Sequence, residues 1–318
     1  MILKNKRNNL IFKATTIFII VLIVLAIVFY GPYEFIRETW ITSAMTTLEH
    51  QWLATSIYDA KTINEILQKH SYVAPKERTN ADLTIIKYDG SDKIELIDVS
   101  TNNFRAYLMK IYDPKRVKLV PCKNLGEQGQ KIKDILSENN AIAGINGSGF
   151  MDTNGHTKGG VPSGLIMSNK KIIYSDNSSN ISLVGLNEDN KLILGFYTMK
   201  EILKSNIRDA VSFAPLLIIN GIPTIINGNG GWGIAPRTAI GQTKDGAILL
   251  LVIDGRQLSS FGATVKDVQD IFIKYGAFNA ANLDGGSSSI MMYENETVNF
   301  PCTSKTGRYI PSAFIVTK

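Results

Sequence analysis

An uncharged run at positions 14–33 constrains the fold of this 318-residue chain more than any other feature. A helix of this length spans the hydrocarbon core of a bilayer. Basic residues precede the run and Glu34 follows it, so we expect the N-terminus in the cytoplasm and the remainder outside. A cleaved signal peptide is the competing interpretation, but the apolar region is long for one and no small-x-small cleavage site precedes Gly31. The sequence therefore predicts a basic cytoplasmic segment (1–13) and a single-pass signal anchor (14–33) in the cell membrane.

The net charge of +6 says little about partners, because four of those charges lie before the apolar run, at Lys4, Lys6, Arg7 and Lys13. About +2 is left for the rest of the chain, and it forms no concentrated basic face. A basic face is the electrostatic signature of nucleic-acid binding, so we expect no nucleic-acid partner.

Cysteine and histidine are too sparse to indicate a metal centre. His50, His70 and His156 are scattered and have no zinc-ligand spacing with the two cysteines. Outside the membrane Cys122 and Cys302 either form one disulfide or remain two separate thiols, and the sequence does not decide between them.

A helical neck is expected between the anchor and the main domain. Apolar residues recur every three or four positions at Ile36, Trp40 and Ala44, as on one face of a helix. The polar stretch 74–81, which contains Pro75, reads as a linker. We therefore assign 34–80 to the neck and linker and 81–318 to the main domain. The neck acts either as a spacer or as a surface that packs on the domain or on a second copy.

Downstream of the linker the pattern is typical of short strands separated by turn residues. Two hairpins are expected, at 216–226 around Asn220-Gly221 and at 288–300. Helices are expected at 127–138, at 198–204 behind a capping box, and at 264–275 before Gly276. The predicted fold class is α+β (mixed α/β), with a β-rich core and a few packed helices. The other predicted strands are 83–88, 94–99, 104–112, 117–121, 141–145, 165–167, 181–186 and 192–197.

Two apolar strands end in Asp-Gly, and this repeated ending is the main signal for a functional site. Residues 248–253 run into Asp254-Gly255-Arg256, and residues 277–283 run into Asp284 and a glycine pair followed by serines. Glycine pairs let backbone N–H groups approach a ligand closely and form an anion-binding concavity. Each Asp-Gly read alone also fits an ordinary turn.

Four glycine-containing segments occur in order, at 145–150, 235–241, 254–256 and 282–288, and together they resemble the phosphodiester glycosidase family. Ser287 stands where we expect a third glycine, and Phe150 is a single aromatic residue. The neck is similar to that of membrane-anchored bacterial members, and the abundance of Lys, Asn and Ile is typical of a low-GC bacterium. The resemblance implies a hydrolase that cleaves the glycosidic bond of sugar-1-phosphodiesters, in exopolysaccharide, teichoic-type polymers or their precursors.

The residue types suit that chemistry. One carboxylate acts as base or nucleophile while the other positions the sugar, and arginine binds phosphate oxygens through paired hydrogen bonds. Each of these residues also has a purely structural interpretation as a turn or surface group. The predicted catalytic residues are Asp284, Asp254 and Arg237, and the predicted substrate-binding residues are Arg256, Asn146, Asn282, Gly285, Gly286, Ser287, Ser288 and Thr238.

No cofactor is firmly predicted. Asp152 and Asn154 carry oxygens suited to a divalent cation such as Ca²⁺, and His156 is a minor candidate for substrate contact. Two rival functions remain open: a phosphodiesterase that cleaves the P–O bond, and a non-catalytic envelope protein that binds phosphorylated glycans. The sugar, the aglycone and the oligomeric state are not fixed by the sequence.

Overall fold

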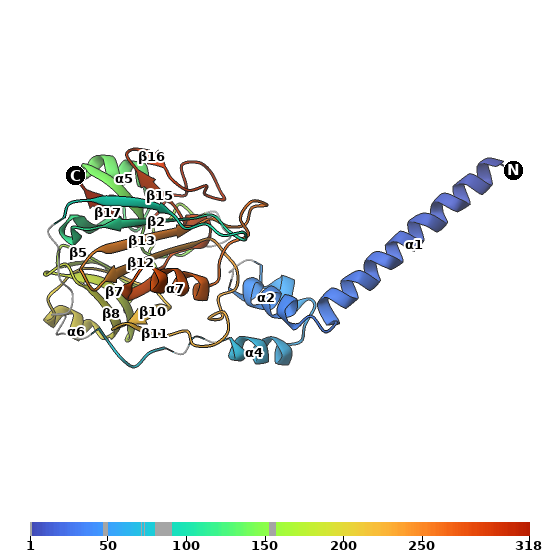
Figure 1. Cartoon of the computed structure of the whole chain (residues 1–318), viewed down its shortest axis with the longest axis horizontal. Helices are drawn as coiled ribbons and strands as arrows, with labels where there is room; N and C mark the ends of the chain where they lie inside the picture. The colour runs from blue at the N-terminus through green and yellow to red at the C-terminus, as the bar shows by residue number, and fades with distance from the viewer. Residues whose placement is uncertain (1, 47–49, 71, 73, 80–90, 153–156) are drawn as a thin grey trace. The chain divides into compact units, whose positions relative to one another are not determined.

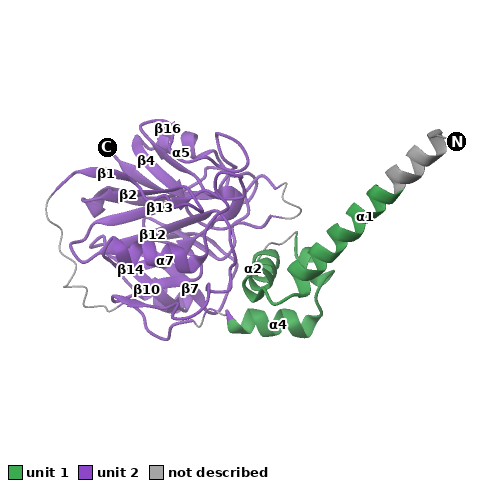
Figure 2. Ribbon diagram, turned by 45° about the vertical axis from the view of Figure 1, so that its right-hand side comes forward, with its two compact units in different colours: residues 1–69 green, residues 70–318 purple. Residues whose placement is uncertain are grey.

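The computed structural model describes residues 2–46, 50–70, 72, 74–79, 91–152 and 157–318 (Figure 1). The chain divides into two compact units, residues 1–69 and residues 70–318 (Figure 2). The stretch predicted as a linker belongs to the second unit, where the Thr79 N–H donates to the carbonyl of Leu194 (2.9 Å). The strand predicted at 83–88 lies outside the described residues.

The first unit is helical. Its long helix α1 (Ile2–Tyr30) contains a stretch, Phe12–Tyr30, that is long and apolar enough to cross a membrane. The neck forms α2 (Glu34–Met45), α3 (Trp52–Thr55) and α4 (Ala60–Lys69), which share a small apolar core. The Tyr30 hydroxyl donates to the Ile57 carbonyl and the Tyr58 hydroxyl to the Phe29 carbonyl, each at 2.8 Å. These bonds fasten the end of α1 to the neck helices.

The second unit contains three antiparallel sheets, which confirms the predicted α+β class. The seven-stranded sheet has the order β1-β2-β13-β12-β14-β10-β11, and the five-stranded sheets have the orders β16-β15-β4-β17-β3 and β6-β5-β9-β7-β8. The strands are β1 (Ile94–Asp98), β2 (Ala106–Ile111), β3 (Val117–Pro121), β4 (Ala141–Asn146), β5 (Leu165–Ser168), β6 (Lys171–Ser175), β7 (Ile181–Asn187), β8 (Leu192–Tyr197), β9 (Ile207–Ser212), β10 (Leu216–Ile219), β11 (Ile222–Pro223), β12 (Arg237–Thr243), β13 (Ile248–Ile253), β14 (Ala277–Leu283), β15 (Met291–Tyr293), β16 (Glu296–Thr297) and β17 (Ser312–Thr317).

Strand β13 is apolar along its whole length because both of its faces are covered. Alternate side chains of a strand point to opposite faces. Leu250 and Val252 enter a core shared by all three sheets. Leu249 and Leu251 face the other way and pack with Phe272 of α7 (Val265–Lys274), which lies against this sheet (Figure 1).

Two of the three helices predicted in the second unit form where they were predicted, and the third begins later than predicted. The capping box predicted at Thr198 forms at the start of α6 (Met199–Lys204), and α7 lies within the predicted 264–275. Helix α7 also has a capping box, at Thr264, which was not predicted. Helix α5 (Ile132–Glu138) begins five residues later than the predicted 127, because Gln130 is paired with Ile310 in a β-bridge. Single turns of 3-10 helix lie at η1 (Pro114–Arg116) and η3 (Gly286–Ser288).

Both predicted hairpins form. Asn220 and Gly221 have φ of 54° and 79° between β10 and β11, as the predicted turn requires. Strands β6, β9, β12 and β17 were not predicted. Strand β12 carries Thr238 and Gln242 at fully buried positions, and this interrupts the apolar alternation by which strands are recognised.

Antiparallel pairing brings several strand ends to one edge. Arg237, at the start of β12, is opposite Ile253, the end of β13, and Thr238 is opposite Leu283, the end of β14. In the second sheet Asn146, the end of β4, is opposite Ala313 of β17. The loops that follow these strand ends form the candidate site.

Candidate active site

The four glycine-containing segments of the sequence meet at this edge. The Asn146 side-chain amide donates to the Asp284 carbonyl (2.6 Å), and the Gly286 N–H donates to the Pro236 carbonyl (2.8 Å). Gly286 has φ of 59°, and a β-carbon there would lie 3.5 Å from the guanidinium of Arg256. Residues from all four segments are therefore brought together.

Asp284 is the chemically unusual group of this cluster. Its Oδ2 atom is buried and has no hydrogen-bond partner among the described residues. Burial raises the pKa of Asp284 to about 7, against the opposing effects of a hydrogen bond from Ser288 and the charge of Arg308. A buried carboxylate oxygen without a partner is costly, so its presence indicates a role other than stability.

Arg308 was not predicted, and it belongs to the same cluster. Its Nη1 donates to Asp152 Oδ2 (2.6 Å) and to Ser287 Oγ (2.9 Å). Its guanidinium carbon lies 4.9 Å from the centre of the Phe150 ring, and its side chain is 14% exposed. No local signal identifies it, because the site-forming residues around it lie far away in the sequence.

Asp152 and Asp284 have pKa values displaced in opposite directions. Burial raises the pKa of Asp152, but hydrogen bonds from Arg308 and Thr157 outweigh it and hold the pKa below its usual value. The negative charge of Asp152 in turn raises the pKa of Asp284. Such divergence is how paired carboxyl groups acquire different roles in acid–base chemistry.

Arg256 presents an exposed guanidinium beside the glycine turn. Its backbone has φ of 59°, and its side chain makes no hydrogen bond or ion pair with any described residue. A guanidinium in this position suits an anionic ligand such as phosphate.

Arg237, predicted to be catalytic, is buried and bound to main-chain carbonyls. Its Nε donates to Ala263 (2.9 Å), and its Nη2 donates to Trp232 (2.6 Å) and Gly233 (2.7 Å). Burial, with a smaller contribution from the charge of Arg256, lowers the pKa of Arg237 to about 9. The side chain holds the loop before β12 in place.

Replacing Arg237 with methionine is therefore expected to lower stability. Three carbonyls lose their donor, at about 1 kcal/mol or more each, which lowers the melting temperature by roughly 6–12 °C. Circular dichroism of the full chain in detergent measures the change. Arg256→Met is the matched control, with a melting temperature within about 2 °C of the parent because the side chain is exposed. A stable but inactive Arg237→Met protein would contradict the structural role.

Asp254, the second predicted carboxylate, is used as a hydrogen-bond acceptor. Its Oδ1 accepts from Asn299 Nδ2 (2.8 Å) and from the Phe300 N–H (3.0 Å). Burial raises the pKa of Asp254, opposed by these hydrogen bonds. Asp254 thus joins the end of β13 to the segment after β16, and the acidic side chain that influences the pKa of Asp284 is Asp152.

Asn146 and Thr238 connect the two sheets beneath Asp284. Asn146 Oδ1 accepts from Thr238 Oγ1 (2.9 Å) and from the Ile290 N–H (3.1 Å), so both residues act within the framework. Asn282 differs, because its Oδ1 is buried without a partner among the described residues, as is Ser289 Oγ. Gly285, like Gly286, approaches Pro236 closely, since a β-carbon on it would lie 2.8 Å from that carbonyl oxygen.

Of the two predicted calcium ligands, Asn154 lies outside the described residues, as does His156, the minor candidate for substrate contact. Asp152 is held by Arg308 and Thr157. Among the described residues no group of three His, Cys, Asp or Glu side chains is placed to hold a metal ion. Cys122 and Cys302 are both free thiols, the first buried and the second partly exposed.

Two known proteins resemble short stretches of this chain in sequence. Over 64 residues the chain is 44% identical to the SPbeta prophage-derived uncharacterized protein YomE of Bacillus subtilis, covering 20% of this chain and 10% of that protein. Over 68 residues it is 32% identical to bovine N-acetylglucosamine-1-phosphodiester alpha-N-acetylglucosaminidase, covering 21% and 13%. The chain thus matches only about a tenth of the length of these relatives.

Solved structures share the fold. The catalytic domain of zebrafish N-acetylglucosamine-1-phosphodiester alpha-N-acetylglucosaminidase, auto-inhibited by its pro-peptide, has a TM-score of 0.62 at 19% identity, covering 76% of this chain and 88% of that one. A putative exported protein of Burkholderia pseudomallei has a TM-score of 0.52 at 16% identity, covering 68% and 74%. The family model for phosphodiester glycosidases matches residues 139–317, more than half of the chain and all four converging segments. This chain belongs to the phosphodiester glycosidase family.

Proposed function

We propose that residues 70–318 hydrolyse the glycosidic bond of sugar-1-phosphodiesters, releasing free sugar and leaving the phosphate on the other product. The observation that carries the proposal is the Asp284 carboxyl group, whose buried Oδ2 has no partner among the described residues and whose charge interacts with Arg308. Arg256 lies beside Gly286, which is two residues further along the chain than Asp284. Membership of the phosphodiester glycosidase family supports it.

In the proposed reaction Asp284 acts as a general base. Its carboxylate accepts a proton from water while the water oxygen forms a bond to the anomeric carbon. The bond from that carbon to the phosphate oxygen breaks, and the electron pair leaves with the phosphate. Arg256 and Arg308 stabilise the negative charge that grows on it. Asp152 holds Arg308 in position, and Arg237 and Asp254 hold the surrounding loops.

We further propose that the Phe12–Tyr30 segment anchors the protein in the cell membrane with the second unit outside. The basic residues before this segment favour a cytoplasmic N-terminus. In that position the available substrates are glycosyl phosphates of the cell envelope or of exopolysaccharide.

Product analysis tests the reaction. The full chain in detergent is incubated with UDP-N-acetylglucosamine and with a panel of N-acetylglucosamine-1-phosphate esters, and the products are separated. Free N-acetylglucosamine is the expected product, with Asp189→Asn, an exposed turn position, as an active control. Release of N-acetylglucosamine-1-phosphate without free sugar would indicate a phosphodiesterase that cleaves the P–O bond. No turnover together with glycan binding would favour a binding protein.

A further inference from the structure

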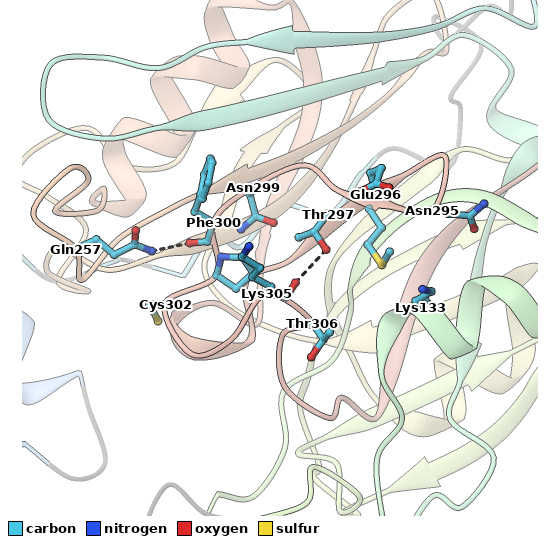
Figure 3. Close-up of a pocket in the computed structure, with 12 residues that line it drawn as sticks. Lys133, Gln257, Asn295, Glu296, Thr297, Asn299, Phe300, Cys302, Lys305 and Thr306 are labelled. Carbon is cyan, nitrogen blue, oxygen red and sulfur yellow. Dashed lines mark hydrogen bonds between the residues drawn. The ribbon is translucent and has the colours of Figure 1, made fainter.

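A pocket of about 610 Å³ lies beside the candidate active site and has no role in the chemistry above (Figure 3). One wall is the segment after β16, including Phe300, Cys302 and Lys305. The turn of the β15–β16 hairpin and Lys133 of α5 complete it. In Figure 3 the lining extends from Gln257 at one side to Lys133 at the other.

The segment that forms this wall leads directly to the active site. Phe300 at its start donates its N–H to Asp254, and Arg308, which follows the segment, donates to Ser287 Oγ of the Asp284 cluster. Gln257, which follows Arg256 directly, donates from Nε2 to the Phe300 carbonyl (2.6 Å). Cys302 lies within electrostatic range of both Arg256 and Arg308. A phosphate bound at these arginines would therefore lie next to the pocket.

The pocket lining is suited to an anionic, hydroxylated ligand. The ammonium groups of Lys133 and Lys305 make no hydrogen bond or ion pair with any described residue, and Glu296 is the one acidic residue of the lining. Amide and hydroxyl groups, such as those of Asn295 and Thr306, supply further donors and acceptors. The Phe300 side chain, 54% exposed, offers an apolar surface of the kind that sugar and polyol carbons contact.

We propose that this pocket is an aglycone subsite that binds a second phosphate, with Lys133 and Lys305 as its ligands. The substrate would then be an oligomeric glycosyl phosphate, in which each repeating unit brings a new phosphate, rather than an isolated diester. Naming the pocket a subsite rests on the proposed function, but the binding of a phosphate-bearing polyol does not.

Kinetics distinguish this role from general stabilisation. Two substrates are compared: the methyl ester of N-acetylglucosamine-1-phosphate, with one phosphate, and its ester with glycerol 3-phosphate, with two. In the double variant Lys133→Ala/Lys305→Ala, KM for the second substrate is expected to rise about tenfold or more, because two charge-assisted contacts are lost. The kcat of the double variant for the two-phosphate substrate should be unchanged, and so should its kcat and KM for the methyl ester. Equal effects on the two substrates, or no effect, would overturn the subsite.

Binding provides a test that needs no turnover. Calorimetry with an oligomer of glycerol phosphate is performed on the full chain in detergent, at low and high salt. The expected result is salt-sensitive binding that weakens about tenfold in the double variant. Lys200→Ala/Lys204→Ala, which removes two exposed lysines of α6, is the matched control and should bind like the parent.

The two proposals can fail separately. Lysine-dependent binding without hydrolysis of any sugar phosphodiester would refute the proposed function and keep the phosphate site. Hydrolysis with oligomer binding that is absent, or indifferent to the two lysines, would refute the phosphate site and keep the function.

Discussion

Replacing Asp284 with asparagine is expected to lower kcat for sugar-1-phosphodiester hydrolysis by about 10³-fold, within the range that general-base catalysis contributes. The amide keeps the size of the side chain but cannot accept a proton from water. Stopped assays of free sugar on the full chain measure the loss. Asp254→Asn is the comparison, because the Asp254 carboxylate accepts hydrogen bonds from Asn299 and Phe300 rather than joining the Asp284 cluster. We expect its main effect on stability, and a greater loss of kcat there than at Asp284 would contradict the assignment.

The pH dependence of the parent enzyme provides a second measurement of the same group. Burial raises the pKa of Asp284 from 3.8 to about 7, so the carboxylate required of a base is lost as pH falls below about 7. Below this value kcat/KM should fall tenfold per pH unit. Asp152, whose pKa is lowered, stays ionised throughout and adds no second limb. A flat profile between pH 5 and 9 would remove Asp284 as the base.

The stability of the folded protein should decrease as pH rises through about 7, whereas activity should increase. Because the folded-state pKa of Asp284 is raised, its favourable contribution is complete below the unfolded pKa and disappears as pH rises through about 7. Ionisation of the buried group costs up to about 4 kcal/mol, taking 1.36 kcal/mol per pKa unit. Asp284→Asn should therefore melt at a higher temperature than the parent at pH 8.5 and at the same temperature near pH 4. This result would also show that the inactive variant is folded.

Replacing Arg308 with glutamine is expected to reduce kcat/KM by roughly 10²- to 10³-fold, as for the loss of one charge-stabilising donor. The variant removes the guanidinium that lowers the pKa of Asp284 and leaves Asp152 without its ion pair. The acidic limb of the pH profile should therefore move to higher pH. Full profiles of parent and variant measure the shift.

Two further variants separate this role from structure. Arg308→Lys retains the positive charge and should restore the position of the limb, while recovering only part of the rate. Arg208→Gln is the matched control, because Arg208 pairs with buried Asp209 at 2.8 Å on the third sheet. It should cost stability and leave the pH limb in place. If Arg308→Gln also left the limb in place, Arg308 would be purely structural.

Local pattern was enough to predict the elements whose formation depends on nearby residues. Thr198 forms its capping box with Glu201, helix α7 ends just before Gly276, and Asn220-Gly221 adopts the positive φ values that a tight hairpin requires. The continuous apolar run at 248–253 likewise predicted the strand that forms β13. These signals are short-range, so tertiary context did not override them.

Elements that depend on distant partners could not be predicted in this way. The buried Gln242 of β12 donates to the Asn190 carbonyl and accepts from the Leu192 N–H, so a strand forms where the sequence lacks alternation. The start of α5 is set by the pairing of Gln130 with Ile310. In each case a backbone or side-chain group finds its hydrogen-bond partner far along the chain.

For the site, the sequence by itself determined that Asp284 ends a buried strand beside a glycine pair, and that three other glycine-containing segments accompany it. Tertiary structure alone decided which charged groups act together. Arg308 forms its ion pair with Asp152, which is 156 residues away in the sequence. Arg308, and not Arg237, is the arginine whose charge acts on Asp284. Arg237 instead donates hydrogen bonds to three main-chain carbonyls. The physical reason is that a pKa depends on burial and on charges a few ångströms away, and only the folded arrangement of the loops sets these distances.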